Sequence, residues 1–284
     1  MSSSIHKILV CGAGTMGAGI ARLAAESGFE VSLFDTDFHA LENARVKIYG
    51  SVQKHFEKGK LNDKEKEQIL SHLKFSDSFK GMEADLIIEA IVEKIEAKVS
   101  LFKDLARHFP EGTILATNTS SLSVTEIASV VPDNKRFIGI HFFNPATVMK
   151  LVEIAKTAFN DVEVIDTVFN FAKQLNKIPV LVKDSPGFIV NRIARQYYLE
   201  AFRLAENQIA DYKTIDHLLE NAGFRMGPFA LTDMIGQDVN YATTQSIYHQ
   251  FFQEARFRPS SIQAQLVKEG HLGKKSGKGF FEYK

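Results

Sequence analysis

The sequence predicts an α/β protein, in which a doubly wound, mostly parallel sheet with an inserted helical hairpin precedes a smaller all-helical domain. Up to residue 183, short β-rich runs alternate with helical patterns, which is typical of a parallel sheet covered on both faces. A turn-rich stretch, Lys183-Asp184-Ser185-Pro186-Gly187, ends this alternation, and helical patterns dominate beyond it. We therefore expect one domain over residues 1–183 and a second over residues 184–284.

Each predicted element follows from its own pattern. The stretch from Phe38 to Leu73 is long for one crossover, and Gly59 and Asn62 divide it into two polar helices, the predicted hairpin. In the second domain, helical spacing of apolar residues predicts helices at residues 188–206, 211–222 and 230–254. Apolar, β-rich runs predict strands at residues 8–11, 30–34, 85–89, 113–116, 137–141, 151–154, 180–182 and 279–283.

Composition excludes several classes of protein. Lys plus Arg number 34 and Asp plus Glu number 34, so no net charge points to nucleic acid or an anionic membrane as a partner. Cys11 is the single cysteine, which rules out an internal disulfide and a multi-cysteine metal site, and we expect no bound metal. No apolar run is long enough to span a membrane. We expect the chain in the cytoplasm or, as a mature protein, in an organelle matrix.

Residues 12–17, Gly-Ala-Gly-Thr-Met-Gly, match the G-x-G-x-x-G pattern directly after a predicted strand and before a helical run. Gly12 allows the tight turn, Gly14 lets the backbone approach a pyrophosphate, and Gly17 allows close packing of the helix. The phosphates would meet N–H groups at the positive end of that helix. This order predicts a Rossmann-type dinucleotide site. Its loop residues are Gly12, Gly14, Thr15, Met16 and Gly17.

Asp35 ends the second predicted strand, 18 residues after Gly17. A carboxylate at this place binds the adenine ribose hydroxyls and disfavours a 2′-phosphate, so we expect NAD rather than NADP as the cofactor. The alternative interpretation is a glycine-rich turn followed by an aspartate that only caps a helix.

His141 ends one predicted strand, and Glu153 lies inside the next, between apolar residues. A carboxylate in such surroundings needs a partner. If the two strands are neighbours, Glu153 can fix the tautomer of the His141 imidazole and stabilise its cation, which makes a general base. The alternative for an isolated histidine is an ordinary surface or structural role.

Three further features have both a functional and an ordinary interpretation. Asn118 and Ser120 follow a strand, where crevice loops lie in doubly wound sheets, but the same run can cap the helix around residues 124–128. Asn191 lies early in the predicted helix at residues 188–206, and its ordinary interpretation is an exposed helical residue. A basic run either binds phosphates or forms a solvated helix face: it contains Lys47, Lys54, Lys58 and Lys60.

Five motifs together closely resemble the L-3-hydroxyacyl-CoA dehydrogenase family, in the short, single-function form that includes 3-hydroxybutyryl-CoA dehydrogenases. The resemblance spans nearly the whole chain. HFFNP with KLVE, followed by PGFIVNR, is more specific than the glycine motif. The motifs are GAGTMG at residues 12–17, HFFNPATVMKLVE at 141–153, DSPGFIVNR at 184–192, GPFALTD at 227–233 and GKKSGKGF at 273–280.

The resemblance implies a reversible, NAD-dependent oxidation of a short-chain L-3-hydroxyacyl-CoA, such as 3-hydroxybutyryl-CoA, by a homodimer joined through its helical domain, which also contributes to the substrate site. It implies that His141 is the catalytic base, that Glu153 orients it, and that Ser120 and Asn191 hydrogen-bond the substrate. Positions matching the family's NAD contacts are Asp35, Glu93, Lys98, Asn118, Asn144 and Lys275. Positions on the hairpin matching its coenzyme A contacts are Ser51, Lys54 and Lys58.

The chain also departs from the family pattern. Ala146-Thr147 replaces a commoner Val-Pro, and Gln237 stands where Leu is usual, so the acyl-chain preference stays open. One alternative is a sugar-acid dehydrogenase of the lambda-crystallin type, which lacks coenzyme A binding. Another is a hydroxyisobutyrate-type dehydrogenase, although its interdomain lysine is absent between Phe188 and Asp211. A non-catalytic dinucleotide-binding protein is the third.

Overall fold

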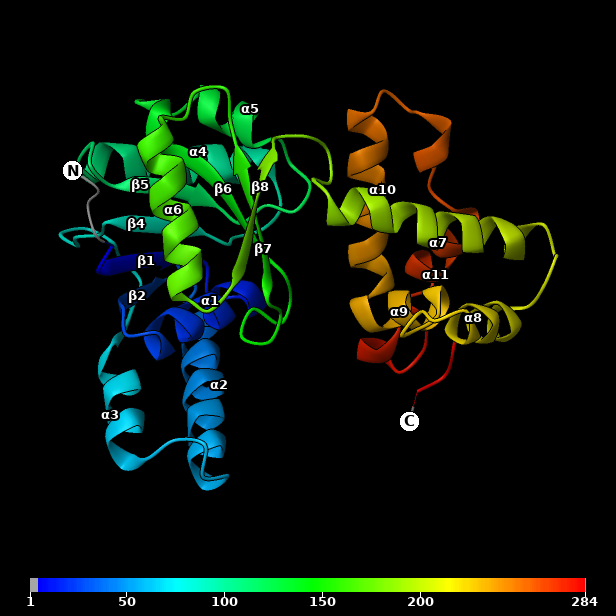
Figure 1. Cartoon of the computed structure of the whole chain (residues 1–284), viewed down its shortest axis with the longest axis horizontal. Coiled ribbons are helices and arrows are strands. Elements are labelled where there is room, and N and C mark those ends of the chain that lie inside the picture. Colours follow the sequence, from blue (N-terminus) through cyan, green and yellow to red (C-terminus); the bar gives the residue numbers. More distant parts are fainter. Residues whose placement is uncertain (1–4, 284) are drawn as a thin grey trace. The chain divides into compact units, whose positions relative to one another are not determined.

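The structure, a computed structural model, describes residues 5–283. The chain divides into two compact units, and the boundary in the sequence lies between Asp184 and Ser185. The predicted boundary lies one residue earlier, in the same turn-rich stretch. Figure 1 shows a sheet with its helices in the first unit and helices in the second.

The first unit contains an eight-stranded sheet in the order β3-β2-β1-β4-β5-β6-β7-β8. Every neighbouring pair is parallel except β6 and β7, which are antiparallel. The seven strands predicted here are all present, with ends displaced by at most two residues, and β3 was missed. The strands are β1 Lys7–Cys11, β2 Glu30–Phe34, β3 Leu73–Ser76, β4 Leu86–Glu89, β5 Ile114–Thr117, β6 Phe137–Phe142, β7 Leu151–Lys156 and β8 Ile178–Lys183.

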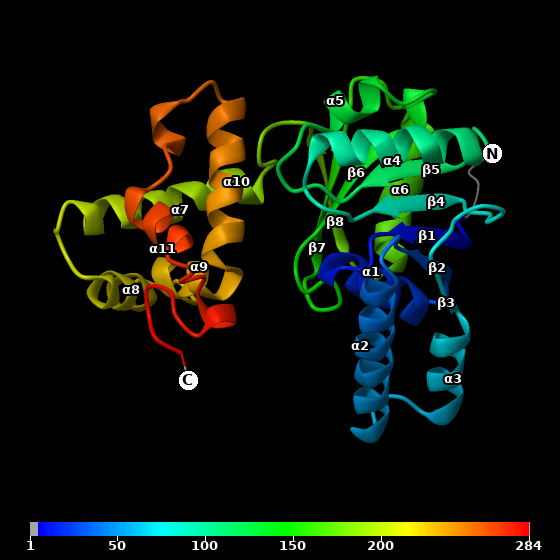
Figure 2. The same ribbon diagram turned by 180° about the vertical axis from the view of Figure 1, so that it is seen from behind.

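Helices cover both faces of this sheet, and the central strands β4, β5 and β6 are therefore buried on both sides. Helices α1 (Thr15–Glu26) and α6 (Val162–Gln174) share one apolar core with the sheet, whereas α4 (Ile95–His108) and α5 (Val124–Ser129) pack on the other face. Figures 1 and 2 show α6 in front of the sheet in one view and α4 in front in the reverse view. The doubly wound fold predicted from the sequence is confirmed.

The predicted hairpin is also present, as α2 (Phe38–Glu57) and α3 (Asp63–Ser71), and it extends away from the sheet (Figure 1). Asn62 starts α3 with a capping box, since its side chain accepts from the Glu65 N–H at 2.9 Å and the Glu65 carboxylate accepts from the Asn62 N–H at 2.8 Å. These local hydrogen bonds explain why the second helix begins at this point of a polar stretch.

The second unit is helical, with an aromatic core in which Phe229 contacts Phe202 and Phe280 at ring-centroid distances of 5.5 Å and 4.8 Å. The stretch predicted as helical at 230–254 is helical up to Gln250 but forms two helices, because Gly236 has φ of 103° and separates them. Helix α11 was missed. The helices are α7 Val190–Glu206, α8 Tyr212–Asn221, α9 Pro228–Ile235, α10 Gln237–Gln250 and α11 Ser261–Lys268.

The strand predicted at residues 279–283 was also wrong, since this segment forms only isolated bridges. Its backbone N–H groups are engaged elsewhere. Those of Phe280 and Phe281 donate to the two carboxylate oxygens of Asp233 at 3.0 Å and 2.9 Å. A buried acid therefore replaces the ladder that the β-rich composition suggested.

No helix within residues 5–283 combines the length and the apolar character needed to cross a membrane. The same residues hold no cluster of three or more His, Cys, Asp or Glu side chains arranged to bind a metal ion.

Candidate active site

The glycine loop between β1 and α1 has the shape that a dinucleotide pyrophosphate requires. Gly12 has φ of 106°, and a Cβ on Gly17 would lie 1.7 Å from the Gly12 carbonyl oxygen, so α1 can approach the loop only with glycine at both places. Space around Gly14 is open. Thr15 and Met16 are the first residues of α1, whose N-terminus has neither a side-chain cap nor an acidic residue in its first turn. Its N–H groups can therefore meet an anion.

Asp35 follows the last residue of β2 and is held against this loop. Its Oδ2 accepts from the Ala13 N–H at 2.7 Å, and its Oδ1 accepts from the Asp37 N–H at 3.0 Å. The carboxylate is half-buried and fixed next to the glycine turn. This arrangement fits a carboxylate that receives the ribose hydroxyls of NAD.

A buried ion-pair network stands at the carboxyl end of β4. Lys98 of α4 is 1% exposed, and its ammonium contacts Glu89 at 2.5 Å and Glu93 at 3.1 Å. Glu89 also accepts from the Thr117 hydroxyl at 2.6 Å. Two carboxylates surround the Lys98 ammonium. We therefore expect Lys98 to hold Glu93 in place, and to affect cofactor binding only through Glu93.

Glu93 in turn organises the loop that carries Ser120. Its Oε1 accepts from the Thr119 hydroxyl at 2.5 Å, the Ser120 N–H at 3.0 Å and the Ser121 hydroxyl at 3.2 Å. Burial opposes ionisation of this carboxyl, but the Lys98 charge and the hydrogen bonds outweigh it and lower the Glu93 pKa. The candidate substrate residue Ser120 is therefore fixed by a charged side chain from the neighbouring strand end.

Asn118 and Lys177 fix the backbone around β6. The Asn118 Oδ1 accepts from the Phe142 N–H at 2.9 Å, which ties the end of β5 to the end of β6. Lys177 is buried and donates to the carbonyl oxygens of Ala146 and Met149 at 2.6 Å and 2.8 Å. The loop between them, which presents the exposed Asn144, is thus held at both ends.

His141 and Glu153 face each other in the antiparallel β6–β7 pair. The His141 Nδ1 lies 2.8 Å from the Glu153 Oε2, and both side chains are buried. This contact was expected from the sequence. Since β6 is parallel to β5, His141 stands near the carboxyl ends of the strands, the edge that also carries the glycine loop and Asn118.

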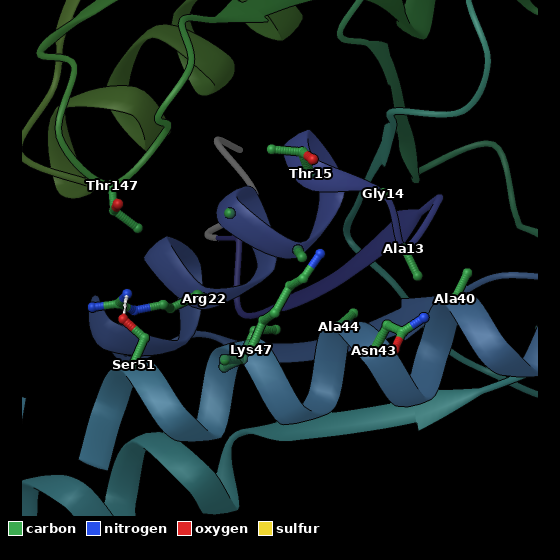
Figure 3. A pocket seen from close by; sticks show the side chains of 13 residues that line it. Ala13, Gly14, Thr15, Arg22, Ala40, Asn43, Ala44, Lys47, Ser51 and Thr147 are labelled. Carbon is green, nitrogen blue, oxygen red and sulfur yellow. Dashed lines mark hydrogen bonds between the residues drawn. The ribbon is translucent and has the colours of Figure 1, made fainter. Parts of the chain in front are cut away.

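A pocket of about 430 Å³ lies between the glycine loop, α1 and α2. Figure 3 shows Lys47 pointing into it from α2, and Arg22 bonded to the Ser51 hydroxyl. Of the three residues predicted for coenzyme A, Ser51 lines this pocket, whereas Lys54 in the last turn of α2 and Lys58 at its C-cap are exposed and do not line it. Lys47 therefore gives the pocket a positively charged side, although the family resemblance did not assign this residue to coenzyme A.

Two predicted site residues belong to the second unit. Asn191 is the second residue of α7 and is half-buried. Lys275 forms an ion pair with Asp238 of α10, with Nζ 2.5 Å from Oδ1.

Sequence reasoning missed Glu89, Arg22 and Lys177. Glu89 had a detectable signal, because an acid that ends a fully apolar strand requires a buried partner. Arg22 and Lys177 contact residues 29 and 31 positions away, and no local pattern reveals such contacts.

Comparison with known proteins gives a consistent result. The family model described as "3-hydroxyacyl-CoA dehydrogenase, NAD binding domain" matches residues 7–185, and the model of its C-terminal domain matches residues 187–283. The chain is 45% identical over its whole length to 3-hydroxyadipyl-CoA dehydrogenase of Escherichia coli (strain K12), and spans 60% of the length of that protein.

Two further relatives are matched over nearly their full length. One is the probable 3-hydroxybutyryl-CoA dehydrogenase of Bacillus subtilis (strain 168), 38% identical over 98% of each chain. The other is the crystal structure of (S)-3-hydroxybutyryl-CoA dehydrogenase from Ralstonia eutropha, with 36% identity and a TM-score of 0.94 over 99% of this chain and 100% of that one. The chain thus belongs to the 3-hydroxyacyl-CoA dehydrogenase family of NAD-dependent oxidoreductases.

Proposed function

We propose that the protein oxidises an L-3-hydroxyacyl-CoA reversibly to the 3-ketoacyl-CoA with NAD, and that His141 is the general acid and base. The observation that carries this proposal is the buried contact of 2.8 Å between His141 and Glu153 at the edge of the sheet that holds the glycine loop. An imidazole held by a carboxylate can take up the proton of a hydroxyl group, because the carboxylate fixes its tautomer and stabilises its cation.

In the oxidative direction, His141 takes the proton of the 3-hydroxyl group as the C3–H bond breaks. Bound NAD supplies the acceptor for the hydride that leaves C3. Because Glu153 holds Nδ1, Nε2 is the ring nitrogen that takes the hydroxyl proton. In the reverse direction, the same nitrogen protonates the forming alkoxide. Ser120 and Asn191 would hydrogen-bond the 3-oxygen and thioester regions of the substrate.

Coenzyme A would bind along the hairpin, where we assign its phosphates to the cationic side chains of α2. Ser51 supports this assignment because it lines the pocket of about 430 Å³ together with Lys47. Lys54 lies in the last turn of the same helix and Lys58 at its C-cap, and both would extend the cationic surface toward the tip of the hairpin. Hydrogen bonds from a lysine ammonium to a phosphate are strong because both groups are charged.

We expect a short acyl chain, in keeping with the 3-hydroxybutyryl-CoA dehydrogenases among the relatives. The decisive experiment measures steady-state kinetics with NADH on 3-ketoacyl-CoAs of four to sixteen carbons. The highest kcat/KM should fall at the short end. Turnover of a free sugar acid, with none on any acyl-CoA, would instead support the sugar-acid dehydrogenase alternative.

The protein should also be a homodimer joined through the second unit. A pocket of about 630 Å³ in this unit has mostly apolar walls, which include Ile193, Tyr197 and Phe224. Ile193 is 67% and Phe224 50% exposed in the single chain, and such surface is typical of protein interfaces. Sedimentation would give the mass of two chains, and a monomer mass at all concentrations would contradict the dimer.

The cytoplasmic location stays a prediction from the sequence.

A further inference from the structure

The loop between β5 and α5 carries Ser120, and two carboxylates from outside the loop hold it. Glu93 holds the part around Ser120, with its Oε1 3.0 Å from the Ser120 N–H donor nitrogen. Asp184 holds the other end, where α5 begins, and no step of the proposed mechanism uses this residue. Asp184 is also the last residue of the first unit. The loop is therefore tied to the residue from which the chain enters the second unit.

Asp184 is half-buried and accepts hydrogen bonds with both carboxylate oxygens. Its Oδ2 accepts from the Ser123 hydroxyl at 2.9 Å and the Thr125 N–H at 2.7 Å, and its Oδ1 accepts from the Val124 N–H at 3.2 Å. These donors are 59 to 61 positions away in the sequence. Ser123 already caps α5, since its Oγ accepts from the Glu126 N–H at 3.2 Å. The contacts of Asp184 therefore come in addition to an ordinary helix cap.

Hydrogen bonds also connect the two held ends of the loop. The Thr119 hydroxyl donates to Glu93 at 2.5 Å, and the same oxygen accepts from the Leu122 N–H at 3.0 Å. The next residue along the chain is the helix cap Ser123, which donates to Asp184. A displacement at the start of α5 would therefore be passed back along the loop to Ser120.

The backbone on both sides of Asp184 is ordered as well. The Asp184 N–H donates to the Lys156 carbonyl oxygen at the end of β7, at 3.2 Å. Beyond the unit boundary, the Phe188 N–H donates to the Ser185 carbonyl oxygen at 2.9 Å and closes a turn, and α7 begins two residues later. A short, hydrogen-bonded segment thus leads from Asp184 to Asn191, the second residue of α7.

We propose that Asp184 is a positioning residue for the dehydrogenase reaction, and that it sets the position of Ser120 through the start of α5. This inference rests on the proposed function, because that function assigns Ser120 to the substrate. Asp184 itself touches neither substrate nor cofactor. It also gives the segment that leads to Asn191 a fixed starting point on the Ser120 loop. One carboxylate therefore links the two parts of the chain that carry the proposed hydrogen-bonding partners of the substrate.

A purely structural role for Asp184 predicts a different result. Loss of a helix cap lowers stability, but it does not change the rate of the molecules that remain folded. Because α5 keeps Ser123 as its cap, loss of Asp184 should leave the helix formed and its start free to shift. A misplacement of about 1 Å can cost a factor of about 10² in rate. A fall in kcat well below the melting temperature therefore distinguishes positioning from stability.

The test measures kcat and KM for the four-carbon 3-ketoacyl-CoA with NADH, at a temperature well below the Tm of every variant. Asp184→Ala should lower kcat by about 10- to 100-fold, while the NADH dissociation constant from fluorescence titration changes by less than about twofold. Asp184→Asn keeps the size and one acceptor oxygen, so its kcat should lie between those of Asp184→Ala and the wild type. If Asp184→Ala fails to fold, Asp184→Asn carries the same comparison.

A double-mutant cycle with Ser120 gives a reading that a structural role would not move. In a Ser120→Ala background, Asp184→Ala should change the single-turnover rate by less than about threefold, because residues that act together give losses that do not add. Asp211→Ala is the matched control. Asp211 caps α8 by accepting from the Thr214 N–H at 2.8 Å and hydroxyl at 3.0 Å, so its loss should lower Tm and leave kcat unchanged.

An unchanged kcat in both Asp184 variants would overturn the inference and leave the dehydrogenase function intact, since the wild type still turns over. The same fold-loss of rate with and without Ser120, or an equal loss of kcat in Asp211→Ala, would overturn it in the same way. Absence of wild-type turnover on every 3-ketoacyl-CoA would instead overturn the proposed function, and the positioning role with it.

Discussion

Glu153 lies directly opposite His141 in the antiparallel β6–β7 pair, with its Oε2 2.8 Å from Nδ1. The backbone ladder sets this contact, because residues facing each other in a strand pair project to the same side of the sheet. A slip of one residue would move the carboxylate to the other face. The geometry of the proposed base is therefore determined by strand register before any substrate binds.

Asp35→Ala should weaken NADH binding by about 10- to 100-fold, because it removes a charged hydrogen-bond acceptor for the ribose hydroxyls. NADPH binding should change less, since the carboxylate opposes the 2′-phosphate. Binding is measured by NADH and NADPH fluorescence titration. Asp166→Ala, an exposed acid on α6, is the control and should leave both affinities unchanged. Equal losses for both nucleotides would argue against a ribose contact.

Lys47→Ala should raise KM for acyl-CoA by about 10-fold, because one cationic contact to phosphate is lost. A pantetheine thioester that lacks the nucleotide phosphates should be unaffected, since the lysine then has no partner to lose. Lys60→Ala, on the exposed turn of the hairpin, serves as control. If NADH binding weakens in place of acyl-CoA binding, the pocket between α1 and α2 belongs to the dinucleotide.

Glu93→Gln should lower Tm at neutral pH, because the Ser120 loop and Lys98 lose a charged acceptor. The Glu93 pKa is lowered in the folded state from 4.5, so its contribution is complete above pH 4.5 and is lost as the pH falls through the folded value. Thermal unfolding at several pH values should therefore show a difference that shrinks below about pH 4.5. Glu67→Gln on α3 should follow the wild type, and a pH-independent loss in Glu93→Gln would contradict the ionic role.

The parts of the fold that were predictable are those in which local chemistry restricts the backbone. Gly12 and Gly17 fix the turn after β1 because a side chain at either place would collide with backbone. The start of α3 could be predicted because Asn62 and Glu65 satisfy each other within one turn. The interpretation of Glu153 as a partner of His141 succeeded because a buried acid in a strand has few choices.

The parts that were missed depend on contacts between distant segments. Phe280 and Phe281 have the composition of a strand, but Asp233 accepts both of their N–H groups. Lys98 was assigned to the cofactor by resemblance, and only the fold places it between Glu89 and Glu93. In both cases the sequence contains the residues but carries no information on the distance between them.

His141 and Glu153 should behave as one functional unit. His141→Ala should lower kcat by roughly 10²- to 10⁴-fold, the usual contribution of a general base. Glu153→Gln should lower kcat by roughly 10²-fold or more, because an imidazole without its carboxylate loses its fixed tautomer and the stabilisation of its cation. NADH affinity should stay near the wild-type value in both variants, since neither side chain is assigned to the dinucleotide.

The double variant supplies the sharpest test of this coupling. It should be little slower than His141→Ala alone, since residues that act together give losses that do not add. Single-turnover rates with NADH and a 3-ketoacyl-CoA measure the chemical step, and NADH fluorescence measures binding separately. Glu282→Gln, an exposed acid in the second unit, is the control for loss of a carboxylate. Fully additive losses, or wild-type turnover in His141→Ala, would mean that another group takes the proton.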